Sequence, residues 1–194
     1  MKKNALRLRS IKCKEEEGQI TLCMGLFFVL FISILLASSL QMEMIRTSSS
    51  YMEDALAASG LASALIDVRE YGTTHVIRIM DVRSSYLRYC EALKGNLGLD
   101  ENWECHNKRL ITGRVKIENY TVYNVKGDQV EYCRLDGGSE EWNVGTKGQV
   151  LAPNGQLIER TGIYSEISYP ITGILGLSVD ARKGKLVDVV GEDE

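Results

Sequence analysis

The strongest pattern in the chain is an uncharged, mostly apolar segment near the N-terminus, which reads GQITLCMGLFFVLFISILLASSLQM. It runs from Gly18 to Met42, 25 residues without a charge. A helix of that length is roughly 37 Å long, more than the ~30 Å hydrocarbon core of a bilayer. The pattern therefore predicts a transmembrane helix over residues 18–42.

Helical periodicity continues beyond this segment, up to Gly72, a residue type that often ends helices. Small or apolar residues recur at spacings of three, four or seven and predict one packing face. That face consists of Ile45, Met52, Ala55, Ser59, Ala62 and Ile66. Because small residues let helices approach closely, the face packs either on the protein's own domain or on another subunit's helix. We expect one unbroken helix with an extension over residues 43–71.

The remaining residues, 72–194, predict a single α+β domain. Residues 73–81 have the β-branched content of a short strand, and Asp81 is suited to cap a helix over residues 82–99. Alternating patterns then predict strands at 113–125, 129–135, 156–173, 174–182 and 185–191. Turn-forming residues predict a turn at 126–128 and loops at 137–138 and 143–156. We expect a small antiparallel β-rich domain of four to six strands with one covering helix.

Charges beside the apolar segment predict its orientation. Arg46 is the one basic residue close behind the segment. Six basic residues precede it: Lys2, Lys3, Arg7, Arg9, Lys12 and Lys14. Since Lys and Arg near a span favour the cytoplasmic side, residues 1–17 form a cytoplasmic basic leader. We expect a cell-membrane protein whose C-terminal domain is extracytoplasmic. The net charge of −3 gives no indication of a nucleic-acid partner.

A removable export signal is the weaker interpretation of the same segment. Such signals have 7–15 apolar residues followed by a small-residue cleavage site. Ala37-Ser38-Ser39 could serve as that site, but the apolar run from Ile20 to Leu40 is 21 residues long. The length therefore favours a retained anchor.

Five cysteines are distributed along the chain. Cys13 precedes the span and Cys23 lies within it, so Cys90, Cys105 and Cys133 are exported, where a disulfide could persist. Three cysteines allow one bridge, and both Cys90 to Cys105 and Cys105 to Cys133 stay open. Three buried thiols without a bridge are the equally weighted alternative.

Catalytic patterns are absent from the sequence. His75 and His106 are the only histidines, and Cys105-His106 lacks a second cluster with metal-ligand spacing. No glycine-rich phosphate loop, serine nucleophile motif or calcium loop occurs. We therefore expect no enzyme activity, no cofactor and no metal.

The basic leader, the acid-glycine junction EEEG and the single helix that continues into a soluble domain resemble type IV pilins and pseudopilins. Residues 15–67 look more particularly like TadE/TadG-like minor pilins of tight-adherence (Flp-type) pilus systems, in their Gram-positive variety. The resemblance covers about the first 70 residues. It implies a structural or assembly component of a pilus or related secretion system, whose partners are the membrane, the machinery and other pilin-like subunits.

The resemblance also implies a processing junction for a prepilin peptidase, between Gly18 and Gln19. Cys23 stands five residues after this junction, where pilins usually carry Glu. That departure argues against a role as the main fibre subunit, and an uncleaved anchor remains the alternative. A second function is also open, in which the helix only anchors an extracytoplasmic binding or sensor module.

Overall fold

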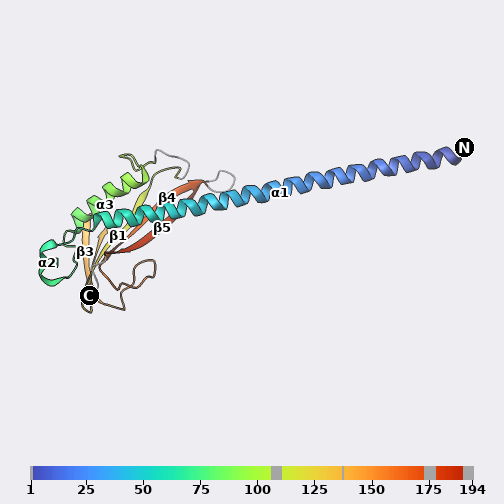
Figure 1. The fold of residues 1–194 in the computed structure, drawn as a ribbon. Helices are drawn as coiled ribbons and strands as arrows, with labels where there is room; N and C mark the ends of the chain where they lie inside the picture. Colours follow the sequence, from blue (N-terminus) through green and yellow to red (C-terminus); the bar gives the residue numbers. More distant parts are fainter. Residues whose placement is uncertain (1, 106–110, 137, 173–177, 190–194) are drawn as a thin grey trace. The chain divides into compact units, whose positions relative to one another are not determined.

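The computed structural model describes residues 2–105, 111–136, 138–172 and 178–189. The chain divides into two compact units, Met1–Ile45 and Arg46–Glu194. Helix α1 (Lys2–Ser63) provides the first unit and the beginning of the second. Among the described residues, the second unit adds two helices and a five-stranded antiparallel sheet (Figure 1). The predicted α+β class, with a long N-terminal helix before the sheet, is confirmed.

Helix α1 ends at Ser63, so the predicted extension to residue 71 is wrong over its last residues. Ile66 forms an antiparallel bridge with Ile79, and the backbone N–H of Asp67 donates to the carbonyl of Arg78 at 2.9 Å. Backbone groups that pair with a distant segment cannot also make the i to i−4 bonds of a helix. This pairing ends the helix before Gly72.

A short separate helix, α2 (Val68–Thr74), follows, so residues 68–71 are helical as predicted but do not belong to the same helix as α1. It begins because the carboxylate of Asp67 accepts from the N–H groups of Arg69 and Glu70, at 2.9 and 3.1 Å. Since α2 includes the start of the strand predicted at 73–81, that prediction is wrong. Only Ile79 of this segment has a β-type partner in the described chain.

Helix α3 (Val82–Leu97) confirms the predicted helix and its cap. The carboxylate of Asp81 accepts from the N–H of Ser84 at 2.8 Å. Gly98 ends the helix with a φ of 60°, a conformation that glycine adopts without strain.

The sheet has the order β3-β2-β1-β4-β5, and every neighbouring pair is antiparallel. The strands are β1 (Lys116–Lys126), β2 (Gln129–Asp136), β3 (Ser139–Thr146), β4 (Gly162–Thr172) and β5 (Ser178–Asp188). Residues 143–146 belong to β3, so the predicted loop there is wrong: β3 pairs with β2 along its whole length. One strand, β5, spans the described part of the two strands predicted at 174–182 and 185–191.

Side chains on the two faces of the sheet form two cores, as alternation along a strand requires. On one face, Val122, Ile163 and Ile167 pack in a cluster that includes residues of α1 and α3. On the other face, Tyr123, Val130 and Tyr164 pack with Ala152 and Ile158 from the segment between β3 and β4. Residues of α1 and α3 therefore pack on the same face of the sheet.

Candidate functional site: the apolar helix and its junction with the sheet

The apolar part of α1 is long enough and apolar enough to span a membrane, by length and composition alone. Residues 19–40 are exposed without exception, including Phe27 at 76% and Leu40 at 72%. Ser33 and Ser38 lie within this stretch, and their hydroxyls donate to the carbonyls of Val29 and Ile34 at 2.8 and 2.9 Å. Such internal bonds satisfy polar groups where lipid supplies no partner.

The predicted processing junction lies inside α1. Gly18 and Gln19 are both helical, and Gln19 is exposed. Cys23 is exposed on the same helix. The junction has no special backbone geometry that marks it as a cleavage site, so it remains a prediction.

The C-terminal part of α1, from Arg46 onward, packs on the sheet of its own unit. Three residues of the predicted packing face are buried: Met52, Ala55 and Ser59. Ala62 is exposed, whereas its neighbour Ser63 is fully buried. Ile45 is partly buried, and Ile66 lies beyond the helix end with 37% exposure. The face that packs on the sheet therefore follows Ser48, Met52, Ala55, Leu56, Ser59, Gly60 and Ser63.

Close approach of helix and sheet explains why small residues line this face. At Gly60, a Cβ atom would lie 3.2 Å from the Cγ2 atom of Val187 in β5. A larger side chain there would push the helix away from the strand. The small residues of α1 that face the sheet thus serve packing within this chain.

Two lysines of β5 pair with Glu53 and attach the C-terminal part of α1 to the sheet. The Nζ atom of Lys185 lies 2.6 Å from one carboxylate oxygen of Glu53, and that of Lys183 lies 2.9 Å from the other. Lys183 also donates to the hydroxyl of Ser49 at 3.2 Å. Hydrogen bonds from Lys185 and Lys183 lower the pKa of Glu53 from 4.5 to about 2. Sequence patterning missed these contacts because the partners are at least 130 residues apart in the chain.

A chain of hydrogen bonds joins α1, α3 and β1 where the three elements meet. The hydroxyl of Ser85 donates to the carbonyl of Ser63 at 2.6 Å and lies 2.6 Å from the hydroxyl of Tyr120. Further along, Asn96 donates to Ser59 at 3.0 Å, and Tyr51 donates to the carbonyl of Asn96 at 2.6 Å. These bonds fix α3 beside the C-terminal part of α1 (Figure 1).

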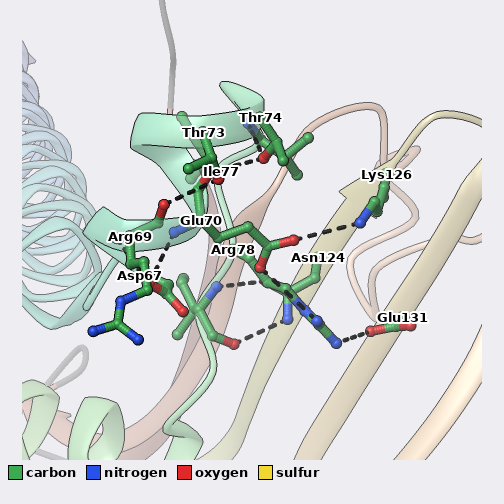
Figure 2. A network of polar contacts seen from close by, with 12 residues as sticks. Asp67, Arg69, Glu70, Thr73, Thr74, Ile77, Arg78, Asn124, Lys126 and Glu131 are labelled. Carbon is green, nitrogen blue, oxygen red and sulfur yellow. Dashed lines mark hydrogen bonds and ion pairs between the residues drawn. The ribbon is translucent and has the colours of Figure 1, made fainter.

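A second polar network fixes the connection between α1 and α3 to the sheet (Figure 2). The amide of Asn124 in β1 bonds both backbone groups of Ile79, accepting at 2.8 Å and donating at 3.0 Å. Arg78 pairs with Glu131 of β2 at 2.6 Å, and Glu70 of α2 lies 3.4 Å from Lys126. Arg78, Glu131, Glu70 and Lys126 each lie beside an opposite charge, and their contacts attach the connection to the sheet.

Cys90, Cys105 and Cys133 are thiols in the structure, and no disulfide links them. Cys105 and Cys133 lie in the core on the helix side, and Cys90 packs against it. Burial raises the pKa of the Cys133 thiol to about 11, with the charge of Glu140 as the second cause. Burial also raises the pKa of Cys90. Neither predicted pairing is formed.

In the described part of the chain, no group of three or more His, Cys, Asp or Glu side chains lies close enough together to bind a metal ion. His75 ends α2 with a φ of 55°. His106 lies outside the described residues. Comparison with family models, with curated proteins and with solved structures finds no match to this chain.

Proposed function

We propose that α1 crosses a cell membrane once, with the basic leader in the cytoplasm and the sheet domain outside. Support comes from the exposed apolar surface of residues 19–40 and from the six basic residues that precede them. In this proposal the apolar helix lies in the membrane, and the domain with its two packed cores lies in water.

We propose further that the chain acts as a minor pilin-like or pseudopilin-like component that assembles through α1, in the manner of the TadE/TadG-like proteins that it resembles. The observation that carries this proposal is the continuity of α1 from the apolar segment to a part packed on the sheet. A simple anchor needs only about 20 apolar residues and a flexible linker. In this chain the apolar segment and the part that packs on the sheet instead belong to one helix, with no linker between them.

One face of α1 remains available for lateral contacts. This exposed face lies on the C-terminal part of the helix and consists of Ser50, Asp54, Ala58, Leu61 and Ala62. Leu61 alone is 55% exposed. Small residues next to an exposed leucine would let a second helix approach closely.

Cysteine crosslinking tests the assembly role. In a Cys23→Ser background, Ala58→Cys places a thiol on the exposed face, and Ala55→Cys places one on the face buried against the sheet. With the native machinery present, we expect oxidative crosslinks between helices from Ala58→Cys and none from Ala55→Cys. Monomer alone from both variants would contradict assembly through this face.

Replacement of the apolar segment tests the alternative of a passive anchor. If an unrelated apolar span in place of residues 20–40 leaves function intact, the helix only tethers a binding or sensor module. Loss of function with normal membrane insertion supports assembly. The intact mass of the membrane form decides the processing step, since cleavage after Gly18 removes residues 1–18.

A further inference from the structure

The sheet opens between two of its neighbouring strands. Pairing of β1 with β2 begins at Thr121 and Arg134, although β1 already starts at Lys116 and β2 continues to Asp136. Beyond that point β2 stays paired with β3. In the part of the chain that the structure describes, β2 extends two residues beyond its last pair with β1, and residues 116–120 of β1 have no partner in β2.

A groove of about 500 Å³ lies at this opening. Four consecutive residues of β1, 117–120, line it together with Leu135 of β2 and the side of α3 at Arg83, Tyr86 and Leu87. Consecutive side chains of a strand point to opposite faces of a sheet, apart from a register shift that β1 has between Ile117 and Asn119. What all four residues share on the groove side is the backbone edge, so peptide groups form part of its wall.

The surroundings of this edge differ from those of the outer strands. Natural sheets protect exposed edges with charged side chains, and β5 carries Arg182, Lys183 and Lys185 while β3 carries Glu140 and Glu141. The opening of β1 is lined by Glu118 and Arg83 as well as by the apolar side chains of Leu135 and Leu87, and Leu87 is 58% exposed. The edge combines backbone that has no partner strand in the described chain with a lining of apolar and charged side chains.

We propose that this groove binds an extended peptide segment of a partner protein, which adds as a short strand to residues 117–120 of β1. Strand addition satisfies the backbone edge by hydrogen bonds, and the apolar lining accepts alternate side chains of the segment. Arg83 lines the groove on the α3 side, where its guanidinium donates to the carbonyl of Gly138 at 3.0 Å. The proposal is independent of any assembly through α1.

The test selects peptides with the full chain in lipid nanodiscs. A displayed library of random nine-residue peptides is panned on these discs after removal of peptides that bind empty discs. We expect enriched peptides with an apolar residue at every second position. Saturation with such a peptide should slow hydrogen exchange at the amides of residues 117–120 by about tenfold or more, as pairing into a sheet protects amides.

Two controls separate strand addition from other binding. Leu87→Arg places a charge at the groove, and we expect the affinity of the peptide to fall about tenfold or more. Val144→Arg changes an equally exposed apolar residue on β3 and should leave affinity unchanged. Because Leu87 is exposed, both variants should fold, which thermal unfolding verifies.

The peptide itself offers the decisive control. Methylation of its alternate backbone nitrogens keeps every side chain but removes donors for pairing, so strand addition predicts loss of binding. Undiminished binding of the methylated peptide, protection confined to β3 or β5, or no enrichment would each overturn the proposal. So would displacement of a second copy of this chain from the groove, which would make the chain its own partner.

Discussion

Glu53 shows how single residues attach the long helix to the sheet. Its carboxylate lies between Lys183 and Lys185, and its side chain is 38% exposed. The exposure means that solvent screens both pairs, so the contribution of Glu53 to stability is small although its pKa falls to about 2. The residue acts as a positioning contact for α1.

We expect Glu53→Gln to lower the free energy of unfolding by about 0.5–1 kcal/mol at pH 7, the range of exposed ion pairs. The pKa of Glu53 is lower in the folded state, so its contribution is present above pH 4.5 and is lost as the pH falls toward 2. Urea unfolding in detergent, followed by tryptophan fluorescence, should therefore show a smaller difference at pH 3 than at pH 7. Asp54→Asn, at the exposed neighbouring position, serves as the control; an equal effect would contradict the specific role of Glu53.

The cysteines provide a second prediction at this scale. Because the Cys133 thiol is buried and its pKa is raised to about 11, we expect almost no alkylation by iodoacetamide at pH 8 in the folded protein. After unfolding without a reductant, Cys90, Cys105 and Cys133 should all become labelled. Intact mass counts the labels. Two labels fewer than expected would demonstrate a disulfide between two of these residues.

At the scale of elements, α1 combines two kinds of surface along one uninterrupted helix. Its first part is exposed and apolar, whereas its second part carries small residues where β5 approaches closely. Helix α3 runs beside this second part, held by the bonds of Asn96 to Ser59 and Ser85 to Ser63. The fit depends on the absence of side-chain volume at Gly60.

We expect Gly60→Val to destabilise the folded protein by about 1–3 kcal/mol, because the added side chain meets Val187 and forces the elements apart. Ala58→Val changes the exposed face of the same helix and should lose only a few tenths of a kcal/mol through helix propensity. Urea unfolding compares the two variants. Because Val has a better helix propensity than Gly, a loss of stability at Gly60 can only come from packing, and no loss in Gly60→Val would contradict the tight contact with Val187.

At the scale of the whole molecule, the proposed topology places residues 72–194 outside the cell. In inverted membrane vesicles, whose cytoplasmic side faces the medium, we expect protease to remove the basic leader while the sheet domain stays protected. Detergent should abolish the protection. Digestion of the domain in closed inverted vesicles would reverse the proposed orientation, and release of the chain by alkaline washing would contradict the span itself.

Local patterns were sufficient for several features of this protein. The uncharged run from Gly18 to Met42 predicted a helix long enough to span a membrane, and Asp81 predicted the start of α3 through its capping carboxylate. Tyr120, Tyr123 and Tyr164 lie within the predicted strands 113–125 and 156–173, and all three are almost fully buried on the sheet. These features depend on a few neighbouring residues, so sequence alone determined them.

Tertiary structure decided the features that depend on distant partners. The bridge of Ile66 with Ile79 ended α1 before the predicted point, and burial passed to Ser63 instead of Ala62 because Ser85 and Tyr120 meet it there. Pairing with β2 made residues 139–146 a strand in spite of their turn-like composition. The separation of β2 from β1, which opens the groove, likewise has no signature in the local pattern. Each of these outcomes rests on hydrogen bonds or contacts between segments far apart in the chain, which hydrophobic periodicity does not encode.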